Sequence, residues 1–255
     1  MSLWEMLAVL AAGTAAGTIN TIVGSGTLIT FPVLLAVGLP PVTATVSNAL
    51  GLVPGSVSGA IGYRAELKGQ RSRIIRLGIS CLVGGLAGAT LLLALPSTAF
   101  ETIVPVLVTL ALVLIVLQPR ISKAVQHRRE RSGTPAHPEG GPLLAVGLVL
   151  ASVYGGYFTA AQGIIYLSLM TMLIDDTIQR LNAVKNVLAA VVNSVAALFF
   201  LFVADFDWTA VLLIAVGSTI GGQIGARVGR RLSPTVLRSL VVAVGLCALV
   251  QLLLR

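Results

Sequence analysis

Long apolar runs separated by short polar loops dominate the chain. A hydrocarbon layer about 30 Å thick takes roughly 20 helical residues to cross, and the runs approach or reach that length. They are apolar on every side, whereas the strands of a membrane barrel would alternate polar and apolar positions. The pattern therefore predicts an all-α polytopic membrane protein. The predicted spans are residues 4–23, 43–61, 77–95, 99–118, 143–160, 180–203, 207–226 and 235–254.

Composition agrees with this pattern. Of 255 residues, 56% are hydrophobic and only 10% are charged, against about 25% charged residues in soluble chains. The mean hydropathy is +0.98. The N-terminus has Glu5 and no basic residue in the region where a cleavable signal carries positive charge, so we read it as the start of the first span.

The net charge of +8 indicates topology rather than a nucleic-acid partner. Most lysines and arginines fall in the short loops 62–76, 119–141 and 226–238, whereas 95–101 and 204–208 carry acidic residues and no basic ones. Basic loops of membrane proteins stay in the cytoplasm. We therefore expect a multi-pass protein of a bacterial cytoplasmic (inner) membrane with these three loops inside.

The polar stretch 119–141 divides the chain into two similar halves. We expect a first transmembrane repeat at 1–118, a cytoplasmic linker at 119–141 and a second repeat at 142–255. Each half has a Gly-containing turn, a short apolar segment (27–37 and 164–174) and a full-length span. The short segments cannot cross as straight helices. If each folds back as a re-entrant or broken helix, the halves acquire opposite orientations and all three basic loops lie on one side.

Interrupted helices in paired repeats predict an anion site near the midplane. A helix that begins inside the membrane exposes unpaired backbone N–H groups and the positive end of its dipole, and an anion can satisfy both. The two turns supply Gly24, Ser25, Gly26, Thr27, Gln162 and Gly163 as candidate substrate-binding residues. The alternative is that the glycines only allow close helix packing.

Polar side chains within the spans extend the candidate site. Asn20, Asn48 and Asn186 are expected to donate side-chain hydrogen bonds, or else to join helices without touching substrate. Lys185 is either a fixed positive charge for the substrate or a lysine that snorkels to the membrane surface. No carboxylate is predicted at mid-membrane, and no metal-binding or catalytic motif is present, so we expect no metal, no cofactor and no enzyme activity.

These residues also resemble the sulfite exporter TauE/SafE family of membrane permeases. The first half matches in the run GTINTIVGSGTLITFPVLLAVGLPPVTATVSNALGLVPGSVSGAIGYR, and the second in YGGYFTAAQGIIYLSLM. The chain departs from the family pattern at Ser25 and Gln162, where the turns are less glycine-rich. The resemblance implies transport of sulfite, sulfoacetate, thiosulfate or related anions. The matching positions are Gly24, Gly26, Pro32, Leu34, Leu35, Gly38, Thr45, Ser47, Asn48, Gly155, Gly156 and Gly163.

The sequence thus predicts a permease or exporter for a small anion, working by alternating access at the repeat interface. The expected partners are that anion and the lipid bilayer, with a homo-oligomer left open and no nucleic acid. Two alternatives are kept: a membrane assembly protein without transport activity, and a facilitator for small neutral solutes.

Overall fold

The protein is a bundle of α-helices, described by a computed structural model over residues 1–132, 139–229, 239, 242–243, 246 and 249–250. Within these residues no strand is found, which confirms the predicted all-α membrane class. The helices are α1 (Leu3–Ile22), α2 (Thr27–Ala36), α3 (Pro41–Gly62), α4 (Arg71–Ala94), α5 (Ser97–Ser132), α6 (Gly141–Phe158), α7 (Gln162–Leu173), α8 (Ile178–Val203) and α9 (Trp208–Val228).

The helix lengths match the predicted division into spanning and short segments. In the described part of the chain six helices are long and apolar enough to cross a membrane: α1, α4, α6, α8, α9 and Thr98–Leu117 of α5. Helices α2 and α7 are apolar but short, as expected of interrupted segments. Helix α3 occupies the expected span 43–61 but is not among these six helices. The expected span 235–254 lies largely outside the described residues.

Helix α5 is longer than its expected span. It continues through Pro119 to Ser132, into the stretch expected to be a linker from residue 119. The segment Ile121–Ser132 is rich in Arg, Lys, Gln and Glu, which are good helix formers even without an apolar face. Residues 133–138 of the expected linker lie outside the described part.

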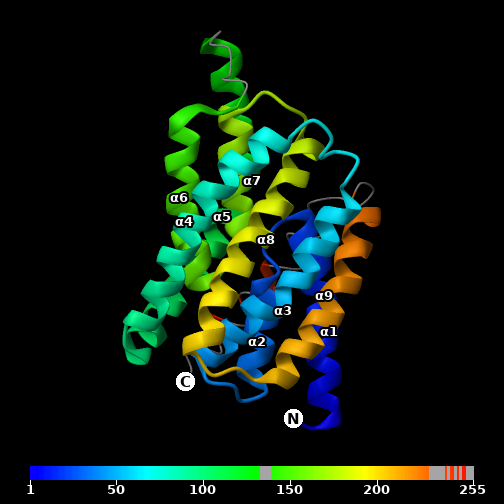
Figure 1. Ribbon diagram of the computed structural model, residues 1–255, viewed down its shortest axis with the longest axis vertical. Helices are drawn as coiled ribbons and strands as arrows, with labels where there is room; N and C mark the ends of the chain where they lie inside the picture. Colours follow the sequence, from blue (N-terminus) through cyan, green and yellow to red (C-terminus); the bar gives the residue numbers. More distant parts are fainter. Residues whose placement is uncertain (133–138, 230–238, 240–241, 244–245, 247–248, 251–255) are drawn as a thin grey trace.

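The chain path gives the bundle two distinct ends (Figure 1). At one end, which we name the basic end, lie the connections 63–70 and 174–177. An ion pair of 2.7 Å joins Arg73, at the start of α4, to Asp176 in the second connection. The opposite end, named the acidic end, carries the N-terminus and the connection 204–207 with Asp205 and Asp207 (Figure 1). Helices α1 and α2 meet inside the bundle, and so do α6 and α7.

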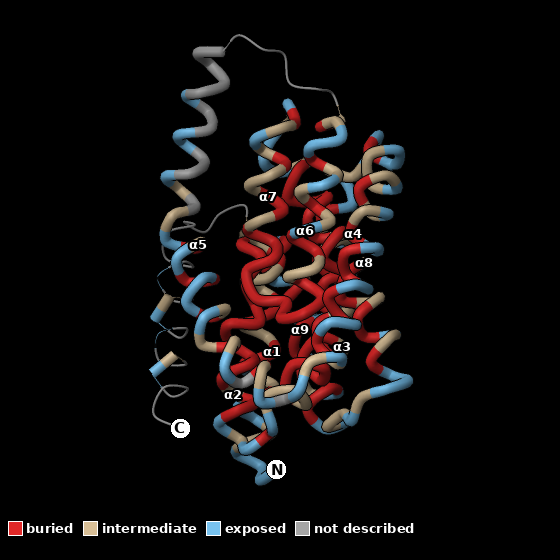
Figure 2. The backbone as a smooth tube through the Cα atoms, turned by 90° about the vertical axis from the view of Figure 1, so that its left-hand side faces the viewer, coloured by how far each residue is buried: buried red, intermediate tan, exposed pale blue. Residues whose placement is uncertain are grey.

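Each half of the chain packs one of its helices against helices of the other half. Helix α9 packs on α1 and α3, while α4 packs on α6 and α8, and α3 also packs on α8. Glycines allow these contacts: a Cβ at Gly17 would lie 2.7 Å from the Ser218 Cα, and one at Gly222 would lie 2.6 Å from the Gly55 carbonyl oxygen. Lipid tails are as apolar as the side chains, so close backbone packing drives association here. The buried positions, red in Figure 2, follow this shared interior.

Candidate substrate site

Two backbone turns interrupt the helices in the middle of the bundle. The first turn ends α1 with Gly24 at φ +91°, a left-handed conformation that glycine adopts without strain. The second turn uses Thr159 at φ +61° and Ala161 at φ +56°. A residue with a Cβ atom pays about 1–2 kcal/mol for this conformation. Such strain concentrates at functional sites, which makes the second turn a candidate.

The two turns touch each other through their backbones. The Gly163 N–H donates to the Gly24 carbonyl oxygen across 3.1 Å. A Cβ at Gly163 would stand 2.6 Å from the Gly24 Cα, so this approach requires glycine. The contact brings the N-termini of α2 and α7 together from opposite halves of the chain.

Backbone donors remain unpaired at both turns. In the described part of the chain, the N–H groups of Ser25, Gly26 and Thr27 have no hydrogen-bond partner, and neither do those of Ala161 and Gln162. Neither helix N-terminus has a side-chain cap. The Gly163 N–H, predicted as a donor to substrate, is instead occupied by Gly24. The remaining five N–H groups are available to a ligand, and we name them the candidate donors.

Lys185 lies beside these turns and is fully buried. Its Nζ donates to the carbonyl oxygens of Asn20 (2.9 Å) and Thr21 (3.2 Å), at the C-terminal and therefore negative end of α1. Its stem lies against the second turn, because a Cβ at Gly163 would be 3.2 Å from the Lys185 Cδ. The snorkelling alternative is therefore wrong. An ammonium has three N–H donors, which leaves one for a ligand.

Two asparagines, like Lys185, donate hydrogen bonds to the end of α1. Asn182 Nδ2 and Asn186 Nδ2 both donate to the Thr21 carbonyl oxygen, at 3.2 and 3.3 Å. The predicted residue Asn186 thus holds the interrupted end of α1 in place. Among the described residues, Lys185 is the only Lys, Arg, Asp or Glu that is fully buried, so it is the one side chain there that can place a charge at the site.

The first turn faces an uncharged polar cluster. Asn48 Nδ2 donates to Thr27 Oγ1 (3.1 Å), and Thr30 Oγ1 donates to Asn48 Oδ1 (2.5 Å). Thr159 Oγ1 lies 3.1 Å from Thr27 Oγ1 and links this cluster to the second turn. The sequence analysis missed Thr30 and Thr159. Thr30 follows Thr27 by one helical turn, a spacing that could have identified it.

Two unpaired polar atoms of side chains lie beside these donors, one a hydroxyl and one an amide oxygen that only accepts. The Ser25 hydroxyl and the Gln162 Oε1 are buried without a hydrogen-bond partner. Gln162 Nε2 donates to Asn193 Oδ1 across 3.3 Å. Asn20 is half-buried, and its Nδ2 donates to Ser56 Oγ at 3.4 Å. An unpaired buried group costs about 1–3 kcal/mol, and a bound ligand would relieve that cost.

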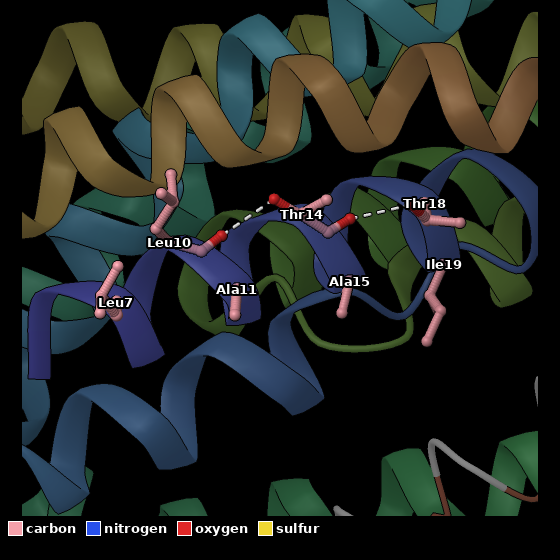
Figure 3. A pocket seen from close by; sticks show the side chains of 7 residues that line it. All are labelled: Leu7, Leu10, Ala11, Thr14, Ala15, Thr18 and Ile19. Atoms are coloured by element: carbon pink, nitrogen blue, oxygen red, sulfur yellow. Dashed lines mark hydrogen bonds between the residues drawn. The ribbon is translucent and has the colours of Figure 1, made fainter. Parts of the chain in front are cut away.

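An open groove of about 750 Å³ along α1 offers no such chemistry. Seven residues of α1, from Leu7 to Ile19, line it (Figure 3). Both of its threonine hydroxyls already have carbonyl partners: Thr14 donates to the Leu10 oxygen (3.0 Å), and Thr18 contacts the oxygens of Thr14 (2.9 Å) and of Gly221 on α9 (3.1 Å). The groove therefore suits hydrocarbon rather than an anion. In the described part of the chain no cluster of His, Cys, Asp and Glu could hold a metal ion.

Comparison with known proteins identifies the family. The model of the family described as "Sulfite exporter TauE/SafE" matches residues 9–252. The chain is 27% identical over 231 residues to the "Probable membrane transporter protein YfcA" of Escherichia coli K12, covering 90% of this chain and 82% of the relative. It is 26% identical over 239 residues to the "Probable membrane transporter protein ORF9" of a Sinorhizobium species, covering 93% of this chain and 88% of the relative. No solved structure matches the chain significantly. The chain therefore belongs to the sulfite exporter TauE/SafE family, whose members are membrane transporters and not enzymes.

Proposed function

We propose that this transporter carries a small anion, of the sulfur oxyanion or organosulfonate class, across the bacterial cytoplasmic membrane. The observation that carries the proposal is the set of five unpaired N–H groups at two opposed helix N-termini beside the buried Lys185. Anions bind such termini because N–H dipoles and the helix dipole both point at them. Sulfite, thiosulfate and sulfoacetate present several oxygens at once, which suits donors converging from two turns.

The unpaired side chains fit the same class of ligand. The Ser25 hydroxyl can donate to an oxyanion, and the spare N–H of Lys185 can provide a charge-assisted bond. The Gln162 Oε1 is an acceptor and would accept a hydrogen bond from a singly protonated anion such as hydrogen sulfite. The proposed site thus has donors for the oxygens and an acceptor for one proton.

We further propose that the two halves are inverted repeats. The packing supports this, since the pairs α1–α9 and α3–α9 correspond to α6–α4 and α8–α4 when the halves are exchanged. The direction of the chain supports it as well, because α3 runs from the acidic to the basic end and α8 runs the opposite way (Figure 1).

The glycine pattern supports one register between the two proposed repeats. Gly84, Gly85 and Gly88 of α4 and Gly221, Gly222 and Gly225 of α9 have identical spacing, and the same interval separates Gly26 from Gly163. In this register Asn48 corresponds to Lys185. One half-site would therefore carry a positive charge where the other carries an amide.

Alternating access would open one end of the bundle at a time. We infer from the positive-inside rule that the basic end faces the cytoplasm. There Asp176 joins α4 to α8 through Arg73 (2.7 Å) and Arg180 (2.9 Å). At the acidic end the Asp207 N–H donates to Ser47 Oγ (3.0 Å), which ties the start of α9 to α3. Opening toward either side would require breaking the contacts of that end.

A ligand panel tests the proposal directly. The detergent-purified protein is heated with sulfite, thiosulfate, sulfate, sulfoacetate or taurine, and with chloride at equal ionic strength. A ligand at 100 times its dissociation constant stabilises the folded state by about 2.7 kcal/mol, which raises the melting temperature measurably. We expect a shift with at least one sulfur anion and none with chloride.

Flux into proteoliposomes then separates the alternatives. Taurine carries no net charge at neutral pH, so equal flux of taurine and sulfoacetate would support a facilitator for neutral solutes. The absence of both a shift and flux for every sulfur anion would refute the proposed substrate class.

A further inference from the structure

A small pocket at the basic end lies apart from the proposed substrate site. It has a volume of about 300 Å³ and lies between the end of α3 and the last turns of α9. Arg64 contributes one side and Arg227 the other, while Gln223 and Ile61 also line it. Helices α3 and α9 pack side by side along their lengths, and their ends meet in Figure 1 at the same corner of the bundle.

The two arginines of this pocket differ from the other arginines nearby. Arg73 and Arg180 share Asp176, and Arg76 pairs with Glu139. In the described part of the chain, by contrast, neither Arg64 nor Arg227 has a carboxylate partner or a side-chain hydrogen bond. Two unneutralised guanidiniums on one pocket attract an anion, and a guanidinium binds phosphate through paired N–H donors.

The carbonyl ends of α3 and α9 lie close to the same pocket and also attract cations. Arg227 lies in the last turn of α9, where its positive charge interacts favourably with the helix dipole. A guanidinium has five N–H donors, so contact with a helix end leaves donors for a phosphate. The floor of the pocket is fixed, because Gln223 Nε2 donates to the Ser58 carbonyl oxygen (2.9 Å) and to its hydroxyl (3.0 Å).

The surface that leads away from the pocket is apolar. Val57 and Ile61 on α3, and Ile220 and Ile224 on α9, are exposed and spaced four residues apart along each helix. Residues four apart lie on the same face of a helix. This face runs from the arginine end of α3 and α9 back along both helices, where the acyl chains of a surrounding lipid would lie.

We propose that this pocket binds the phosphate of an anionic phospholipid, whose acyl chains lie along the exposed faces of α3 and α9. Basic pockets between membrane helices on the cytoplasmic side bind such headgroups. The apolar face below the arginines favours a lipid over a free phosphate, which would gain nothing from it. The site is independent of the proposed substrate and stands even if that proposal fails.

The experiment is a titration of the delipidated protein with phosphatidylglycerol and, separately, with phosphatidylcholine, followed by melting temperature and native mass spectrometry. The test variant is Arg64→Gln/Arg227→Gln. The matched control is Lys68→Gln/Arg71→Gln, which removes the same charge from exposed positions outside the pocket. Each variant is first melted without lipid, so that a folding defect is separated from a binding defect.

We expect phosphatidylglycerol to bind more tightly than phosphatidylcholine. Removing both arginines should lower the affinity of the test variant for phosphatidylglycerol by about 30-fold, while the affinity of the control variant stays close to that of the native protein. Equal losses of affinity in the two variants would show that surface charge in general attracts the lipid, and would overturn the proposal that the pocket binds it. A shift with inorganic phosphate equal to that with the lipid would overturn the lipid as its occupant.

Discussion

Replacing Lys185 with Met removes the buried positive charge while keeping an unbranched side chain of similar length. Two opposing terms set the effect on stability. The Asn20 carbonyl oxygen loses its partner, which costs about 1–3 kcal/mol, whereas Thr21 keeps its bonds from Asn182 and Asn186. Against this, burying an ammonium costs several kcal/mol that Met does not pay. We expect Lys185→Met to fold, with its stability within about 2 kcal/mol of the native protein.

The effect on an anionic substrate is much larger. An anion bound about 4 Å from the ammonium gains about 4 kcal/mol at the effective dielectric constant of partly buried pairs. Losing that term weakens binding by about three orders of magnitude. The effect on transport should therefore exceed the effect on folding by a wide margin, which is the signature of a residue that binds substrate.

The assay compares anion flux in proteoliposomes and the ligand-dependent melting shift for the native protein, Lys185→Met and Lys68→Met. Lys68 is exposed at the basic end, so its replacement removes one charge without touching the site. We expect flux and shift to vanish in the first variant and persist in the second. Unchanged flux in correctly inserted Lys185→Met would refute the reasoning and leave Lys185 with only its structural bonds to α1.

Three further changes, two at the turns and one at the basic end, are tested by thermal melting. Gly163→Ala should destabilise by about 1–3 kcal/mol, since its Cβ would stand 2.6 Å from the Gly24 Cα, whereas Gly78→Ala, with open space around it, should be neutral or stabilise by up to about 1 kcal/mol. Ala161→Gly should stabilise by about 1 kcal/mol by relieving the left-handed backbone, and no gain would show that this turn is unstrained. Burial raises the pKa of Asp176, but hydrogen bonds from Arg73, the Thr177 N–H and Arg180 outweigh it and leave the pKa below its usual value. The stability contributed by the ionised Asp176 is thus fully present above the ordinary carboxyl pKa, and it is lost as the pH falls through the lowered pKa. Asp176→Asn should therefore be about 1–2 kcal/mol less stable than the native protein at pH 7, and its stability should fall less in acid.

Hydropathy and charge were sufficient to predict the membrane class, the two short helices and the two turns. This success has a physical reason, because a membrane permits only segments that satisfy their own backbone and places basic loops on one side. Gly24 and Gly163 were identified for the same reason, since an interruption needs residues that allow a turn and a close contact. The sequence also identified Lys185 as a polar residue in an apolar span.

The partners of these residues could not be predicted. Nothing in the sequence says that Ala161 adopts φ +56°, because alanine rarely does so and only the surrounding fold imposes it. The bond from Gly163 to Gly24 joins positions far apart in the chain, and therefore depends on how the halves pack. The contact of Thr159 with Thr27 has the same origin.

The position of Lys185 suggests how one charged side chain can stabilise the fold and still allow a bound substrate to dissociate. Its ammonium already bonds to two carbonyl oxygens of α1, so a bound anion shares the charge rather than receiving all of it. A lysine with no other partner would bind an anion tightly, and the slow release of that anion would limit turnover. Any movement of α1 relative to α8 changes the distance from Nζ to Asn20 and Thr21, and so changes how strongly the anion is held. We therefore expect the affinity for substrate to depend on the packing of α1 against α8, and that packing is the contact that a rocking motion of the halves would alter.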